Sequence, residues 1–166
     1  MGAIFTQGAT RADIIADITK DFESEGGICR TIAKTVCGNV LYVVHENSHT
    51  GRRFIGVYTL LKDGDFGWGR RSESEQMGPV HYNCPLHLLE LAGPTDDVRA
   101  LAWRAKVREH HASRQAQKDR LAGLKLGQRL ELVDSTIPYV DIVQLSPLRG
   151  VYMGQRYRIP ARFVAA

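Results

Sequence analysis

The sequence lacks long hydrophobic runs. No apolar stretch approaches the roughly 18–20 residues that a membrane-spanning helix requires. The first residues also lack the basic segment and apolar core that are typical of a secretory signal. These absences predict a cytoplasmic protein without a membrane partner.

Cysteine is scarce, with Cys29, Cys37 and Cys84 among 166 residues. An odd number of cysteines without close spacing does not predict a disulfide framework, so reduced thiols are the simpler interpretation. His81, Cys84 and His87 are spaced three apart, but the chain has no CxxC pair and no HxxxH pair on a helix. A closed zinc site needs four ligands, so we predict no metal.

Common enzyme motifs are also absent. The chain has no phosphate-binding GxxxxGK[ST], no GxGxxG after a strand, no HExxH and no GxSxG. These absences disfavour a nucleotide-driven machine or a common hydrolase, and we expect no cofactor.

What the sequence does contain is typical of a globular protein. Hydrophobic residues make up 43% and charged residues 24%. The net charge of +4 is compatible with nucleic acid or with an acidic protein surface as partner, and it argues against a DNA mimic.

The pattern predicts an α+β fold. Thr10 and Asp13 have the spacing of a capping box before a helix over about residues 11–23. Gly38-Asn39 is typical of a hairpin turn. Strands are expected at residues 3–6, 28–36, 39–46 and 52–61, which suits an antiparallel sheet with the helix on one face.

The second half predicts a long basic helix followed by a small β meander. Thr95 and two acidic residues begin a helix over about residues 96–122, after a short helix over 85–93. One apolar stripe contains Val98, Leu101, Ala102 and Ala105, and a flanking stripe contains Trp103 and Val107. We predict an α+β domain over 1–123 and a small β subdomain over 124–166, packed on it.

The central stretch, residues 64–91, is rich in Gly, Pro and special polar residues. Phe66 and Trp68 are expected to close the sheet as a last short strand. Residues 70–79 lack periodicity, which favours a loop.

Two interpretations of this stretch involve catalysis. Cys84 precedes a short helix whose N-terminus would lower a thiol pKa, and His81 or His87 would serve as base. The Glu73/Glu75 pair has a spacing seen in mono-ADP-ribosyltransferases. A buried cysteine and a solvated charged loop are the simpler alternatives.

The central stretch is also similar to a known family. Gly67-Trp68-Gly69, residues 75–79 and residues 82–86 resemble the core of an uncharacterised family found on bacterial plasmids, phages and integrative elements. The opening residues 5–19 and the YRIP at 157–160 are similar as well. The family pattern differs at Arg70-Arg71 and at His81. The resemblance implies a mobile-element setting and interference with host defence.

We therefore expect a non-enzymatic accessory protein that binds a host protein or ribonucleoprotein complex in a bacterial cytoplasm, inhibiting a defence system such as CRISPR or restriction. An alternative is a nucleic-acid-binding accessory protein that uses the basic helix over 99–120. A weaker alternative is an enzyme centred on Cys84 or Glu73/Glu75. The expected partner-binding residues are Trp68, Arg70, Arg71, Met77, Tyr82, Arg104, Arg108, Arg114 and Lys118.

Overall fold

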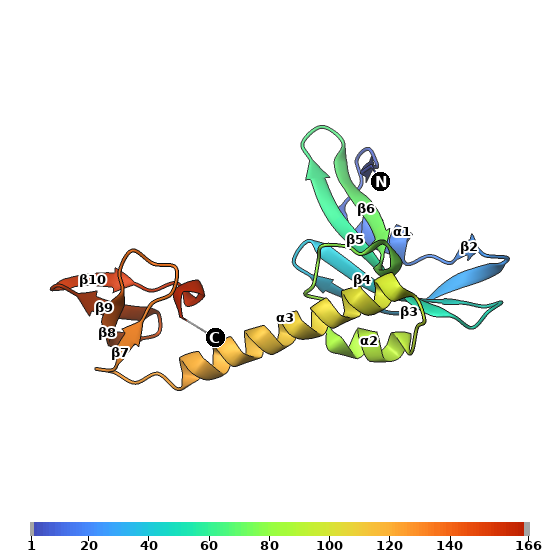
Figure 1. Ribbon diagram of the computed structural model, residues 1–166. Helices are drawn as coiled ribbons and strands as arrows, with labels where there is room; N and C mark the ends of the chain where they lie inside the picture. The colour runs from blue at the N-terminus through green and yellow to red at the C-terminus, as the bar shows by residue number, and fades with distance from the viewer. Residues whose placement is uncertain (1, 165–166) are drawn as a thin grey trace. The chain divides into compact units, whose positions relative to one another are not determined.

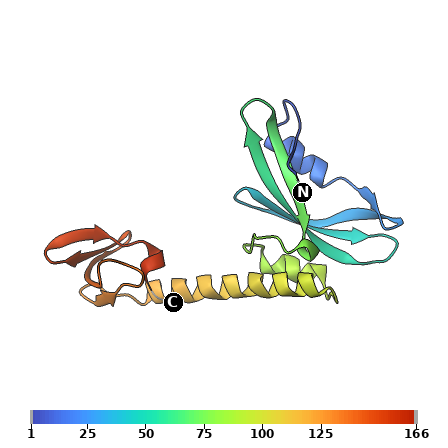
Figure 2. The same cartoon turned by 45° about the horizontal axis from the view of Figure 1, so that its top comes forward.

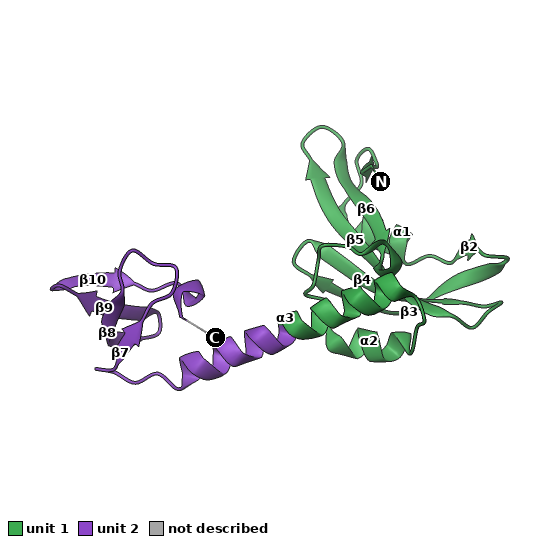
Figure 3. Cartoon of the chain, viewed as in Figure 1, with its two compact units in different colours: residues 1–110 green, residues 111–166 purple. Residues whose placement is uncertain are grey.

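The computed structural model describes residues 2–164 (Figure 1). The chain divides into two compact units, residues 1–110 and 111–166 (Figure 3). The division lies within the long helix α3 (Val98–Ala122), upstream of the boundary expected at 123/124. The α+β class is confirmed, whereas the packing of residues 124–166 on the first domain as a small β subdomain stays a prediction.

The first unit is built on a six-stranded antiparallel sheet with strand order β1-β6-β5-β4-β3-β2. Its central strand β4 is buried on both faces, because Val40, Tyr42 and Val44 point one way and Leu41 and Val43 point the other. The strands are β1 (Ile4–Phe5), β2 (Phe22–Ser24), β3 (Gly27–Cys37), β4 (Val40–Asn47), β5 (Arg53–Asp63) and β6 (Gly67–Ser74).

Helices cover both faces of this sheet (Figure 2). Helix α1 (Arg11–Ile18) packs on the Leu41 face. Helix α2 (Leu86–Ala92) and the first half of α3 pack on the Tyr42 face. A 3-10 turn, η1 (Glu75–Met77), connects β6 to the segment that precedes α2. Among the helices of the described residues, none combines the length and the apolar character needed to cross a membrane.

Helix α1 begins as the sequence predicts and ends earlier. The Thr10 hydroxyl accepts from the Asp13 N–H, and the Asp13 carboxylate accepts from the Thr10 N–H at 2.9 Å. The helix ends at Ile18 rather than near residue 23, because Phe22 pairs with Cys29 and the segment joins the sheet as β2. Pairing of β2 with β3 therefore outweighs the helical preference that the spacing of Phe22 suggests.

The loop expected over residues 70–79 is wrong for its first half, since β6 extends to Ser74. The strand pairs with β5 from Asp63↔Gly67 to Gly56↔Ser74. Its polar side chains find partners on both faces, so the strand needs no apolar alternation. Gly69 allows β1 to approach, because a Cβ there would collide with the Ile4 carbonyl and with Phe5.

Helix α3 buries the flanking stripe rather than the first one. Trp103 and Val107 are buried together with Ala100 and Arg104. In contrast, Val98 is 79% exposed and the other members of the expected apolar stripe are exposed as well. The helix thus presents aliphatic side chains to solvent on the face turned away from the sheet.

The second unit contains the end of α3 and a four-stranded antiparallel meander of order β10-β9-β8-β7, which confirms the predicted C-terminal meander. Its core includes Leu130, Val140, Ile142 and Ile159. The strands are β7 (Arg129–Glu131), β8 (Tyr139–Leu145), β9 (Leu148–Tyr152) and β10 (Gln155–Arg158), and a 3-10 turn η2 (Ala161–Phe163) follows.

Candidate functional site

A buried ion pair fixes α3 on the sheet. Arg104 donates to both carboxylate oxygens of Glu75, with Nε to Oε2 at 2.6 Å and Nη2 to Oε1 at 2.8 Å. Glu75 Oε1 also accepts from the Ile55 N–H at 3.0 Å, and Arg104 donates to the Gly93 carbonyl. One pair therefore connects β5, η1, α3 and the α2–α3 connection.

The segment after η1 is held in a fixed path along α3. Gly78 adopts φ of +66°, which turns the chain after Met77. His81 Nε2 lies 3.1 Å from the Thr59 hydroxyl, and the His81 carbonyl accepts from Trp103 Nε1 at 3.2 Å. Further along, the Tyr42 hydroxyl donates to the Asn83 side chain. The side chains between these anchors are therefore pre-positioned.

A small groove lies between this segment and the first half of α3. Its volume is about 150 Å³. Trp103, which is 2% exposed, forms its base. The groove is lined by Gly78, Tyr82, Arg99, Ala102, Trp103 and Lys106. We refer to these six residues as the α3 groove; its size suits one inserted side chain rather than a whole substrate.

The rim of the α3 groove is cationic. The Lys106 ammonium lies 5.6 Å from the centre of the Tyr82 ring, which is a cation–π contact. Among the described residues, no carboxylate lies within ion-pair distance of Arg99 or Lys106. Both charges are therefore available to a partner.

Exposed apolar side chains adjoin the groove. Met77, which precedes Gly78, is 48% exposed, and Val80 is 69% exposed. Val98 precedes Arg99 and is 79% exposed. Aliphatic surface next to unpaired cations is typical of a protein-binding face.

The structure does not bring all the expected binding residues together. Trp68 and Arg70 lie on the other face of the sheet, against α1. There the Arg11 guanidinium lies 5.7 Å from the Trp68 ring, and Arg70 pairs with Asp17. This pairing lowers the pKa of the Asp17 carboxyl. Trp68 and Arg70 are thus committed to intramolecular contacts away from the groove.

The remaining expected arginines differ in their surroundings. Arg71 Nη2 lies 3.7 Å from Glu73 Oε2, and both side chains are half-buried. Arg104 is 3% exposed, so its charge is not presented at the surface. Arg108 is exposed on α3 in the first unit, whereas Arg114 and Lys118 are exposed on the part of α3 that belongs to the second unit.

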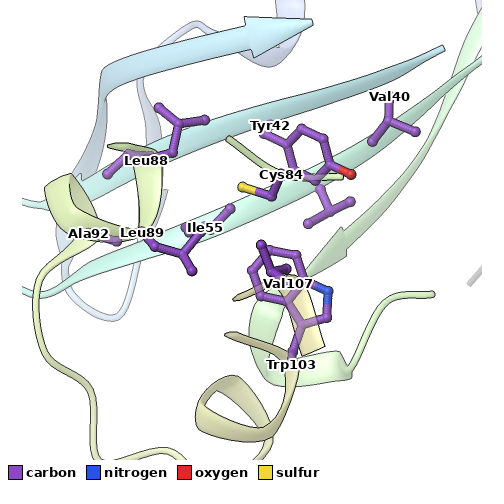
Figure 4. Packing of buried hydrophobic residues seen from close by; sticks show 11 residues of the cluster. Val40, Tyr42, Ile55, Cys84, Leu88, Leu89, Ala92, Trp103 and Val107 are labelled. Carbon is purple, nitrogen blue, oxygen red and sulfur yellow. The ribbon is translucent and has the colours of Figure 1, made fainter. Parts of the chain in front are cut away.

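Cys84 lies in the core rather than in a cavity (Figure 4). It packs with Tyr42, Leu88, Trp103 and Val107 and is 0% exposed. Burial raises the pKa of its thiol far above the ordinary value, so the thiolate needed for nucleophilic attack is disfavoured. This environment fits the packing alternative for Cys84.

The Glu73/Glu75 pair is likewise occupied. Glu73 lies on β6, whereas Glu75 begins the turn η1. Glu75 is 1% exposed and is saturated by Arg104 and the Ile55 N–H, and Glu73 contacts Arg71. Neither carboxylate is poised to orient a substrate.

Metal-ligating side chains do not cluster in the part of the chain that the structure describes. Among the described residues, no group of three or more His, Cys, Asp or Glu side chains converges. His45 is fully buried and its Nε2 lies 2.9 Å from the Tyr58 hydroxyl. Burial lowers the pKa of His45 to about 4, so its ring is neutral at neutral pH.

The sequence predicted Tyr82, which lines the groove, and Met77, which precedes it in the chain. It did not predict the groove residues on α3 as binding residues. The signal is present in the spacing of Arg99, Ala102 and Lys106, which with Trp103 follows the i, i+3, i+4, i+7 rule for one helix face. The fold was needed to show that this face meets Tyr82. Comparison with known proteins gives no match to a family model, to a curated protein or to a solved structure.

Proposed function

We propose that this protein is a non-enzymatic binding protein and that the α3 groove receives a partner protein. The observation that carries the proposal is a preformed groove with an indole at its base, beside a tyrosine and two cations that have no ion-pair partner within residues 2–164. Aromatic and arginine side chains around a small pocket are the groups that dominate binding energy at protein interfaces.

The partner that fits best is a protein surface that combines acidic residues with one protruding apolar side chain. The apolar side chain would enter the groove and contact the Trp103 indole. Carboxylates around it would meet Arg99 and Lys106, whose charges steer association and fix orientation. Met77, Val80 and Val98 would extend the apolar contact beyond the groove.

Several observations favour binding over catalysis. Cys84 is buried with a raised pKa, and Glu75 is saturated by hydrogen bonds. The α3 groove holds no convergent set of a nucleophile, a base and an oxyanion site. A groove of about 150 Å³ is also smaller than the roughly 300–1,000 Å³ of ordinary ligand pockets.

The groove is tested by capture of host proteins on immobilised wild-type protein, with and without nuclease. Ala102→Arg fills the groove and Lys106→Glu inverts its rim charge. We expect both variants to lose the captured protein, because each removes a different part of the complementarity. Arg108→Glu is the matched control, since Arg108 is exposed on the same helix but does not line the groove.

Two results would overturn this proposal. One is a partner that binds Ala102→Arg as well as wild type. The other is capture that disappears on nuclease treatment, which would assign the interaction to nucleic acid.

Within the same proposal, the partner belongs to a bacterial defence system and the protein acts for a mobile element. The support is the resemblance of residues 67–86 to plasmid and phage proteins and the non-catalytic site. We expect expression of the protein to raise the transformation efficiency of a plasmid targeted by CRISPR or restriction, and Ala102→Arg to abolish the effect. Equal transformation with and without the protein would contradict this role.

A further inference from the structure

The positive charge of this protein is concentrated in its second unit. Residues 111–166 contain nine Lys/Arg and four Asp/Glu, whereas residues 1–110 contain 13 Lys/Arg and 14 Asp/Glu. The net charge of +4 therefore comes from the smaller unit, and the larger one is close to neutral. An anionic partner that is attracted by net charge would therefore bind the second unit.

Three arginines gather on one face of the meander. Arg158 on β10 pairs directly with Arg149 on β9, and Arg156 lies two residues before Arg158 on the same face. The opposite face of these strands carries Tyr152 and Tyr157, which pack on the core of the unit. The arginines therefore lie on the outer face of the sheet. We call Arg149, Arg156 and Arg158 the arginine face.

The arginine face carries positive charge that the carboxylates of residues 2–164 do not pair. Among the described residues, no carboxylate lies within ion-pair distance of these three side chains. The nearby acid Asp141 pairs instead with Arg129, with Oδ1 at 2.9 Å from Nε, and this contact lowers the pKa of Asp141. Arg149 Nε is buried and has no hydrogen-bond partner among the described residues.

Binding of an external anion would relieve the repulsion between these arginines. Like charges directly opposite each other on neighbouring strands destabilise a sheet, so the Arg149–Arg158 pair costs stability when no anion is bound. Residues two apart on a strand are separated by about 6.7 Å, so Arg156 and Arg158 suit two successive anionic groups rather than one. A chain of regularly spaced phosphates satisfies all three guanidinium groups.

We propose that the arginine face binds the phosphate backbone of a single-stranded nucleic acid. On strands β7 and β8 of the same sheet, the Arg129 guanidinium, whose charge is paired with Asp141, stacks on the Tyr139 ring at 4.0 Å and presents a planar surface. Stacking of bases on such planes accompanies phosphate contacts in proteins that bind single strands. This proposal concerns the second unit and does not depend on the α3 groove.

The test measures fluorescence anisotropy of labelled single-stranded DNA and RNA of about 20 nucleotides, a length that covers the site of one small domain. Three phosphate contacts predict a slope of about −2 in the plot of log affinity against log salt concentration. Arg156→Gln/Arg158→Gln should reduce that slope to about −0.7, since one phosphate contact remains.

The control variant removes the same charge from the other unit. Arg52→Gln/Arg108→Gln, two exposed arginines of the first unit outside the α3 groove, should bind the oligonucleotide within about two-fold of wild type if the phosphates contact the arginine face. Arg156 and Arg158 are exposed, so their substitution is expected to preserve folding, which circular dichroism verifies.

Three outcomes would overturn the proposal. The first is equal loss of affinity in both double variants, which would indicate net charge alone. The second is a salt-independent affinity. The third is binding to anionic phosphatidylserine vesicles without binding to either oligonucleotide, which would assign the face to a lipid surface.

Discussion

Glu75 and Arg104 form a bidentate ion pair in the core of the first unit, and both side chains are less than 5% exposed. The pair connects the turn after β6 to the helix that carries the α3 groove. Because removal of one partner leaves a buried charge, such pairs are far more costly to break than to replace.

Arg104→Met is expected to destabilise the first unit by about 3–5 kcal/mol, because the Glu75 carboxylate then stays buried and unpaired. The double variant Glu75→Gln/Arg104→Met should recover part of this loss, since the amide oxygen still accepts from the Ile55 N–H. Urea unfolding followed by tryptophan fluorescence measures the change, and both tryptophans lie in the first unit.

The matched control for this prediction is Arg108→Met, an exposed arginine one turn further along α3. It should change the free energy of unfolding by no more than about 0.5 kcal/mol. An Arg104→Met variant as stable as Arg108→Met would show that the pair contributes nothing to the fold.

His45 predicts an acid-sensitive stability. Its pKa is lowered from 6.5 to about 4 by burial, so between these pH values the unfolded chain binds a proton that the folded protein does not. The free energy of unfolding should therefore fall as the pH drops through this window, by about 3 kcal/mol at its lower end. Urea midpoints measured across the window test this sign and size.

A substitution isolates the contribution of this ring. His45→Gln should flatten the pH dependence of the urea midpoint, whereas the exposed His49→Gln should leave it unchanged. If His45→Gln unfolds with the same pH dependence as wild type, other groups are responsible.

Cys84 should behave as a packing residue. Burial raises the pKa of its thiol, so iodoacetamide at neutral pH should modify Cys84 only after unfolding. Cys37, whose thiol pKa burial also raises, is only half-buried and should react faster than Cys84 in the folded state. Cys84→Ser should keep partner binding, at a cost of about 1 kcal/mol in stability. Rapid native-state labelling of Cys84, or loss of function in a folded Cys84→Ser variant, would instead support the enzyme alternative.

The sequence predicted the fold well where local patterns and packing agree. The Thr10–Asp13 capping box and the long helix over about 96–122 were found because their signals are local. A short last strand was expected around Trp68, but the extension of β6 through residues 70–74 was missed, because its polar residues are satisfied by partners distant in the chain, such as Asp17 for Arg70. Long-range pairing leaves no trace in local periodicity.

The candidate site was predicted only in part for the same reason. Tyr82 and Met77 were recognisable as unusual residues in a Gly- and Pro-rich stretch. The burial of Arg104 was not recognisable, because an arginine on a basic helix looks the same whether it faces water or Glu75. The exposure of Val98 was also unexpected, since an apolar residue in a helical stripe usually marks the core.

Trp103 belongs at once to the hydrophobic core and to the base of the α3 groove. A substitution of Trp103 would disturb the interior, whereas Arg99 and Lys106 line the groove as exposed side chains outside the core cluster. Substitutions at Arg99 and Lys106 should therefore leave the fold stable, whereas substitutions at Trp103 should destabilise it. A change of binding partner would then require substitution of Arg99 and Lys106 only, while Trp103 keeps the base of the α3 groove unchanged.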